Sequence, residues 1–158
     1  MSNLVLSREV YCPVAEVWRY HTDMVKAPEY WSNLSRCERN DGGSGPPEVG
    51  ATYRWEYNML GRHFNGTFRI TEVAPFERFY FEAGGQIRAR FRHEYRATAK
   101  TRTRITVMVD YEVPGLLGKA VNVLFVEKRN AADAEHAMDQ LKEHLEAEVM
   151  TRVDAGVV

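Results

Sequence analysis

The sequence predicts an α+β fold in which a curved, seven-stranded antiparallel sheet packs around one long C-terminal helix. Three patterns predict this class. Residues 50–115 alternate between apolar and polar almost throughout, as strands with one buried face do. From Leu116 to about Met150, apolar residues instead recur at helical spacing, opposite Lys, Glu, Asp and Gln. Between an N-terminal strand and the remaining strands, two short segments carry helix signals.

The first 31 residues predict one strand and two short helices. Asn3–Tyr11 is rich in Leu and Val and predicts the strand. Pro13 fits the first turn of a helix, where its missing N–H costs nothing. The helix is expected to run from Pro13 to about Val25, with one face formed by Val14, Val17, Trp18 and either His21 or Thr22. Pro28 interrupts this pattern, so Pro28–Trp31 predicts a second short helix or a turn.

Six further strands complete the predicted sheet. Leu34–Asn40 is a weak strand that leads into Asp41–Pro47, a loop rich in turn residues. Gly61, Pro75 and Gly84–Gly85 then separate the alternating runs. Because the connections are short, neighbouring runs pair as an antiparallel meander with one dry face and one wet face.

The chain is expected to form a single domain over residues 1–150, followed by a flexible tail over residues 151–158. A length of 158 residues suffices to bury a core without disulfides or metals. The apolar stripe of the last helix is unusually long, so we expect a kink or break near Gly118 or Asn130.

Composition and charge exclude several functions. With 21 basic and 22 acidic residues and a net charge of -1, the chain lacks the positive excess of a nucleic-acid binder. No apolar run reaches the ~18 residues that cross a bilayer, which predicts no membrane insertion. The N-terminus lacks a basic segment followed by an apolar one, so we expect a cytoplasmic protein. Cys12 and Cys37 are too few for a disulfide framework and are expected to be free thiols. The sequence does not separate a monomer from a homodimer.

Residues 88–97 separate two kinds of side chain most clearly. A strand sends successive side chains to opposite faces. One face therefore carries Arg88, Arg90, Arg92 and Arg96, and the other carries Ala89, Phe91, His93 and Tyr95. We expect the arginines to face solvent near Glu82, Asp110 and Glu112, and the alternate residues to face the interior.

A mismatch of widths predicts an internal cavity. One helix is about 10–12 Å wide, whereas six strands at ~4.8 Å spacing form a layer more than twice as broad. The sheet must curl around the helix, and unfilled space becomes a pocket. The aromatic residues on its dry face carry polar tips, which favours a ligand site over a solid core. The predicted lining residues are Tyr53, Trp55, Tyr57, Phe68, Phe79, Phe81, Phe91, His93, Tyr95, Tyr111, Val121 and Phe125. The segments Gly42–Pro47 and Pro114–Gly118 are expected to gate it.

Several motifs resemble the START-like (SRPBCC) superfamily and its bacterial polyketide cyclase/dehydrase proteins. C12-P-V-A-E-V-W18 is similar to the opening of that family's first helix, and A27-P-E-Y-W31 to its P-x-W segment. V49-G-A-T-Y53, the hairpin N65-G-T-F-R-I-T-E-V-A-P-F-E-R-F79 and V113-P-G-L-L-G118 extend the resemblance over nearly the whole chain. The resemblance implies a helix-grip fold, but the superfamily includes transporters, sensors, sequestering proteins and enzymes.

Chemistry at this pocket would depend on few groups. His93 is the candidate general acid or base, with Tyr57 or Tyr95 polarising a carbonyl. A core histidine bonded to a neighbouring tyrosine is the simpler interpretation. The remaining histidines show no metal-ligand spacing, and no nucleotide-binding or hydrolase motif occurs, so we expect neither a metal nor a cofactor.

Three functions remain open on this basis. The preferred one is binding of an apolar, aromatic or polycyclic small molecule, lipid or polyketide-like, between the sheet and the last helix. The resemblance also suggests a polyketide aromatase/cyclase or dehydratase. The third is a self-resistance protein that sequesters a reactive natural product without turnover.

Overall fold

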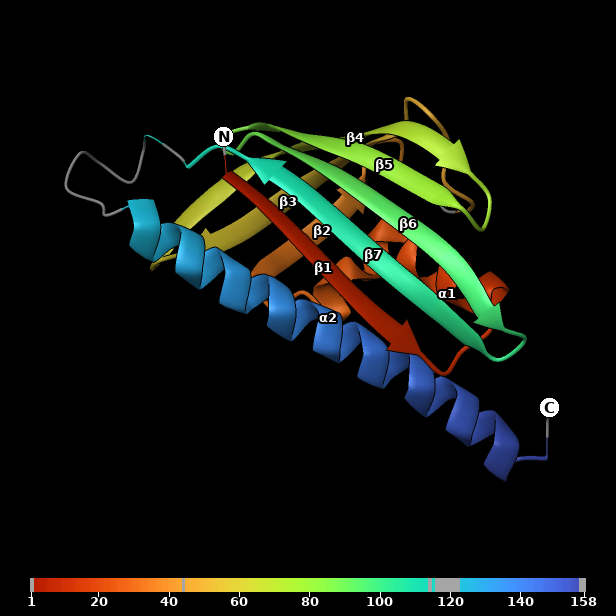
Figure 1. The fold of residues 1–158 in the computed structure, drawn as a ribbon. Coiled ribbons are helices and arrows are strands. Elements are labelled where there is room, and N and C mark those ends of the chain that lie inside the picture. Colours follow the sequence, from red (N-terminus) through yellow and green to blue (C-terminus); the bar gives the residue numbers. More distant parts are fainter. Residues whose placement is uncertain (1, 44, 114, 116–122, 157–158) are drawn as a thin grey trace.

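The computed structural model describes residues 2–43, 45–113, 115 and 123–156, and its architecture is the predicted α+β, helix-grip class (Figure 1). The strands are β1 (Ser2–Val10), β2 (Leu34–Arg39), β3 (Thr52–Met59), β4 (Arg62–Ala74), β5 (Arg78–Gly85), β6 (Ala89–Ala99) and β7 (Arg102–Tyr111). The helices are α1 (Val14–His21), the 3-10 helix η1 (Met24–Glu29) and α2 (Val123–Asp154).

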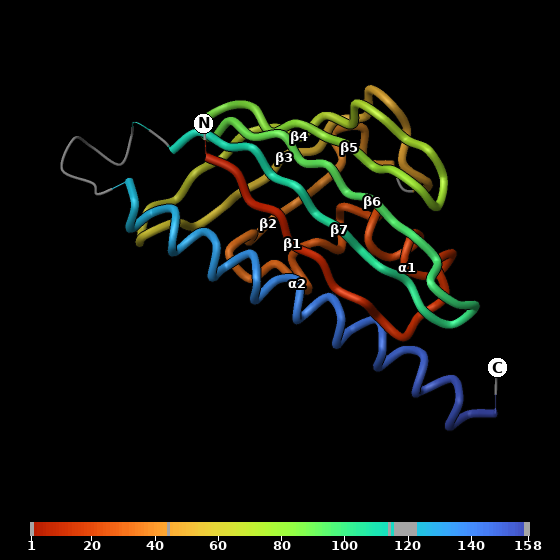
Figure 2. Tube along the Cα trace, in the orientation of Figure 1, coloured from red at the N-terminus to blue at the C-terminus, as the bar shows by residue number. Residues whose placement is uncertain are grey.

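All seven strands form one antiparallel sheet in the order β1-β7-β6-β5-β4-β3-β2, so β1 and β2 are its edges. The sheet curves, and α2 runs diagonally along its open side next to β1 (Figure 2). The segment α1–η1 fills the same side nearer β2 and β6. The core therefore lies between the curved sheet and these helices, as the width mismatch predicts.

Local sequence signals set the strand boundaries at Gly61 and Pro75 as expected, whereas β5 continues through Gly84 and Gly85. Leu60 and Gly61 both have positive φ, 50° and 74°, and form the two-residue turn between β3 and β4. Such a turn matches the twist of the paired strands. β4 ends at Ala74, because Pro75 cannot donate to the sheet.

The first helix ends earlier than the sequence predicts. α1 stops at His21 instead of Val25, because Asp23 has a ψ of 87° and leaves the helical region. The hydroxyl of Thr22 donates a hydrogen bond to the Trp18 carbonyl at 2.6 Å, which satisfies the last turn. η1 then begins at Met24 and includes Pro28, where the second helix was expected to begin.

The C-terminal helix differs from the expectation at its end. α2 passes Asn130 without a break and continues to Asp154, through half of the expected flexible tail. The two terminal guanidinium nitrogens of Arg152, Nη1 and Nη2, donate hydrogen bonds to the Glu16 carboxylate on α1, which holds this last turn. The predicted start at Leu116 and the predicted kink at Gly118 lie outside the described residues.

Polar contacts along the rim attach α2 to the rest of the fold. On the β1 side, Arg8 pairs with Glu135 and with Asp139, the latter at 2.9 Å. Lys142 Nζ donates to the Glu9 carbonyl at 2.8 Å. On the other side of α2, in the segment before β2, the side-chain amide of Asn33 donates a hydrogen bond to the Asp133 carboxylate at 2.7 Å. These contacts lie outside the apolar interior.

The arginines of β6 face solvent, as predicted. Arg88, Arg90, Arg92 and Arg96 are all exposed. Arg92 lies 3.5 Å from Asp110, and Arg90 stands opposite both Glu82 and Asp110 in the strand register. Pairs of this kind on exposed strands each contribute about 0.2–1 kcal/mol.

Gly66 on β4 makes room for the indole of Trp55. Trp55 and Gly66 are direct partners across β3 and β4. A Cβ at Gly66 would overlap the Gly84 carbonyl oxygen and the six-membered ring of Trp55. The missing side chain therefore fixes how closely the tryptophan packs against the sheet.

We predict that Gly66→Ala lowers the free energy of unfolding by about 3 kcal/mol, because backbone and indole must both move. Gly84→Ala is the matched control, since no atom lies within 4 Å of its Cβ position, and it should change stability little. Urea unfolding of both variants measures the difference. Equal effects of the two substitutions would contradict the close packing of Trp55 on Gly66.

Candidate functional site

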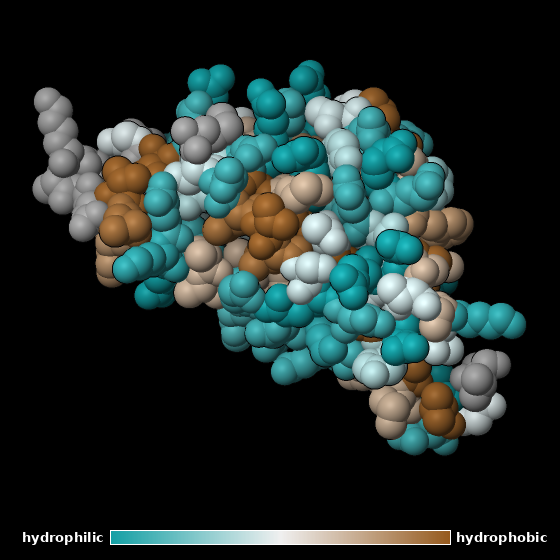
Figure 3. Space-filling model, viewed as in Figure 1, coloured by the Kyte–Doolittle hydropathy of each residue, from teal (hydrophilic) through white to brown (hydrophobic). Residues whose placement is uncertain are grey.

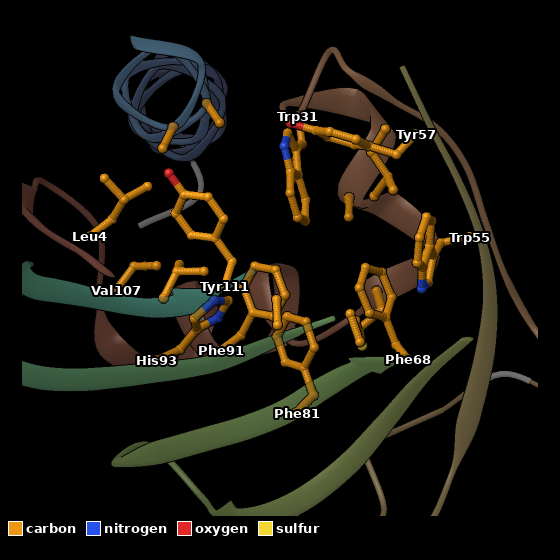
Figure 4. Close-up of a pocket in the computed structure, with 18 of the residues that line it drawn as sticks. Leu4, Trp31, Trp55, Tyr57, Phe68, Phe81, Phe91, His93, Val107 and Tyr111 are labelled. Carbon is orange, nitrogen blue, oxygen red and sulfur yellow. The ribbon is translucent and has the colours of Figure 1, made fainter. Parts of the chain in front are cut away.

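A cavity of about 150 Å³ lies between the concave face of the sheet and the helices. Figure 4 shows aromatic rings from β3 to β7 around this space, with α2 seen end-on above it. Predicted residues that line it are Trp55, Tyr57, Phe68, Phe79, Phe81, Phe91, His93 and Tyr111. These eight are half of the sixteen strand residues that line the cavity.

Of the other four predicted lining residues, three do not line the cavity and one lies outside the described residues. Tyr53 and Tyr95 are buried but do not reach the cavity, because Tyr53 packs nearer the start of β3 and Tyr95 turns its hydroxyl to α1. Phe125 is 56% exposed, in a hydrophobic surface cluster at the start of α2 (Figure 3). The helix presents Val126 and Asn130 inward instead. Val121 lies outside the described residues.

The described residues of the two expected gate segments do not line the cavity. The described residues of Gly42–Pro47 do not line it. Pro114–Gly118 lies outside the described residues apart from Gly115, which is exposed and also absent from the lining.

The helices contribute residues that the sequence pattern did not single out. From α1, η1 and the segment that follows come His21, Met24, Ala27, Tyr30 and Trp31. From α2 come Asn130, Ala134, Ala137 and Met138. His21 shares the apolar face of α1, and Trp31 belongs to the P-x-W segment, so signals for both were present. No local pattern indicated that Asn130 faces inward.

Stacked aromatic rings form the floor of the cavity. Phe81 and Phe91 stack with centroids 4.6 Å apart and an interplanar angle of 6°. Phe68 contacts Phe81 edge to face at 5.2 Å. Trp31 covers this floor, with its ring 5.7 Å from Phe91 and 6.4 Å from Phe68. Aromatic pairs at these distances add to the stabilisation from burial.

Two buried histidines lie at one side of the floor. The rings of His21 and His93 are parallel, with centroids 4.5 Å apart. The Tyr95 hydroxyl and His21 Nδ1 share a hydrogen bond of 2.8 Å. Burial lowers the pKa of His21 to about 3 and holds the pKa of His93 well below its usual value, with a further contribution from His21. Both imidazoles are therefore neutral near pH 7.

Three buried polar atoms of lining residues have no hydrogen-bond partner among the described residues: Trp55 Nε1, His93 Nδ1 and Asn130 Oδ1. Leaving such an atom unpaired costs about 1–3 kcal/mol. The lining that the structure describes includes no Asp, Glu, Lys or Arg side chain. The cavity is thus apolar and uncharged, with a few unsatisfied polar atoms in its walls.

Neither cysteine is placed for nucleophilic chemistry. Cys12 and Cys37 are buried free thiols, outside the lining. Burial raises the pKa of each thiol to about 12, so neither is a thiolate near pH 7. Among the described residues, no three His, Cys, Asp or Glu side chains gather closely enough to hold a metal ion.

Comparison with solved structures assigns the fold to the START-like, helix-grip class. A protein from Thermus thermophilus is similar with a TM-score of 0.74 and 18% identity, over 93% of this chain and 99% of that one. A START superfamily protein from Mycobacterium smegmatis gives 0.72 and 16%, over 92% and 97%. The Zhui aromatase/cyclase from Streptomyces sp. R1128 gives 0.71 and 15%, over 99% of both chains.

The sequence itself identifies the family. Residues 1–146 match the family described as polyketide cyclase / dehydrase and lipid transport, and the chain belongs to it. No curated protein sequence matches the chain significantly. Within the described residues, no helix is both long and apolar enough to cross a membrane.

The neutral histidines predict acid sensitivity. A histidine with a lowered folded-state pKa binds fewer protons folded than unfolded, so stability is lost as pH falls below the unfolded value of about 6.5. For His21 this window extends to about pH 3. The free energy of unfolding should fall by about 2 kcal/mol between pH 7 and pH 5.5 from the two groups together.

Urea unfolding at both pH values measures this loss, and His93→Phe should remove about half of it. His136→Gln, at an exposed position, is the control and should leave the loss unchanged. An unchanged pH dependence in His93→Phe would show that the buried pair is not its source.

Proposed function

We propose that the protein binds an apolar aromatic small molecule in the cavity between the sheet and α2. The observation that carries this proposal is the aromatic, uncharged cavity of about 150 Å³ between the sheet and the helices. Protein interiors are otherwise packed with few voids larger than a water molecule. Apolar, aromatic walls with a few polar atoms are typical of a ligand site.

Small side chains on α2 leave the cavity unfilled, which supports a binding site. Ala134 and Ala137 lie on the helix face toward the cavity, where Leu or Met would fill it. Leu141 and Leu145, further along the same helix, are fully buried and do not line the cavity. The helix is therefore closely packed over one part of the sheet and recessed over another.

Binding is favoured over catalysis by the state of the candidate catalytic groups. The lowered pKa of His93 makes its imidazole a weak base near pH 7. Tyr95 does not line the cavity, and its hydroxyl is hydrogen-bonded to His21. Burial raises the pKa of Tyr57. With no carboxylate in the described lining, the acid/base pair expected of a cyclase is missing from those residues.

Cyclase activity, which the sequence also suggested, is the alternative function. The family description and the similar Streptomyces aromatase/cyclase support it. The two functions share the same cavity and differ in turnover. Binding without turnover also includes sequestration of a reactive product, which differs only in the fate of the ligand.

We predict that Ala134→Leu abolishes binding of aromatic probes, because the longer side chain occupies the recess. Thermal unfolding with benzene, indole and naphthalene measures this: at least one probe should raise the Tm of the unmodified protein, and none that of the variant. Native mass spectrometry of the freshly purified protein adds a search for a retained ligand.

Ala132→Leu, two residues earlier and exposed, is the matched control and should bind like the unmodified protein. Circular dichroism establishes that both variants fold. If no probe binds, or if Ala134→Leu binds as well as the control, the cavity is not a ligand site.

A further inference from the structure

We propose that the cavity selects an uncharged, single-ring phenol, whose hydroxyl donates a hydrogen bond to Asn130 Oδ1. This inference rests on the proposed binding function and narrows its ligand from aromatic or polycyclic molecules to one chemical class. It follows from three properties of the site: its volume, its lack of charge and one unsatisfied acceptor.

The volume sets the size of the ligand. A cavity of about 150 Å³ is comparable to an engineered protein cavity that holds benzene. A second fused ring would have to displace the wall. The aromatic rings of this wall pack on one another. The ring centroids of Phe81 and Phe91 are 4.6 Å apart, and those of Trp31 and Phe91 are 5.7 Å apart. Moving them would lose these contacts, so a single ring fits best.

The lining determines the charge of the ligand. An ion buried without a partner costs several kcal/mol or more. The described lining contains no Asp, Glu, Lys or Arg, and its two histidines, His21 and His93, are neutral and stacked on each other. A carboxylate or an ammonium group on the ligand would therefore enter without compensation, so the ligand is neutral.

Asn130 determines which polar group the ligand carries. Its side chain borders the cavity from α2, and Oδ1 is buried without a partner among the described residues. An amide oxygen only accepts hydrogen bonds, so the missing partner must donate. Ala134 follows one turn later with a small side chain, which leaves room beside the amide. A hydroxyl on a ring in the recess is the donor that this geometry accommodates.

The other two unpaired atoms are less suited to this role. A Cβ at Gly66 would lie 2.8 Å from Trp55 Cε2, the atom bonded to Nε1, so this edge of the indole faces the sheet. Figure 4 likewise shows the Trp55 nitrogen at the end of the ring nearest the strands. His93 Nδ1 can donate or accept, depending on the tautomer of the neutral ring, so it does not determine which polar group a ligand carries. Asn130, on the helix opposite the aromatic floor, is the remaining candidate.

Calorimetric titration of the full-length protein with phenol, benzene, benzoate and 2-naphthol tests the inference at pH 7. Phenol should bind about tenfold more tightly than benzene, the gain expected from one satisfied buried acceptor. Benzoate and 2-naphthol should each bind at least tenfold more weakly than phenol. These comparisons use the unmodified protein and do not depend on the folding of a variant.

Asn130→Leu then tests the assigned partner. The variant should keep benzene binding and lose the preference for phenol, whereas Asn58→Leu, at an exposed position on β3, should keep that preference. The inference is overturned if 2-naphthol or benzoate matches phenol, or if Asn130→Leu still prefers phenol. If only 2-naphthol binds, the phenol inference fails and the proposed binding function stands. If none of the four ligands and none of benzene, indole and naphthalene binds, both the inference and the proposed function are overturned.

Discussion

One long helix and the short segment α1–η1 have to cover a sheet of seven strands, and this geometric constraint underlies the rest of the structure. Strands spaced at ~4.8 Å form a layer much broader than a helix of about 10–12 Å, so the sheet bends around α2. Large side chains such as Leu141 and Leu145 fill part of the concave side. Where α2 carries Ala134 and Ala137, the same constraint leaves a cavity.

Charge is arranged so that the helix is attached without introducing ions into the interior. Arg8 binds Glu135 and Asp139 at the β1 edge, and Arg152 binds Glu16 near the end of α2. These pairs are at the rim, where water reduces the cost of ionic groups. The cavity is therefore lined by aromatic and aliphatic side chains and by neutral histidines, with no charged side chain among the described lining residues.

The unsatisfied polar atoms of the walls lower the stability of the empty protein. Each of Trp55 Nε1, His93 Nδ1 and Asn130 Oδ1 costs about 1–3 kcal/mol where it has no partner. Such costs are tolerated where a site serves function more than stability. Of these atoms, Asn130 Oδ1 borders the cavity from the helix side, and the proposed binding would satisfy it.

The sequence by itself determined which residues of each strand face inward, because alternation records the two faces directly. It predicted the family, the sheet and lining residues such as Phe81 and Phe91. Only the tertiary structure decided what lies opposite that face. Tyr95 meets His21, 74 residues away, and Asn130 meets the cavity instead of breaking its helix. Periodicity reports that a side chain is buried, but its partner depends on how separate elements pack, and no local pattern contains that information.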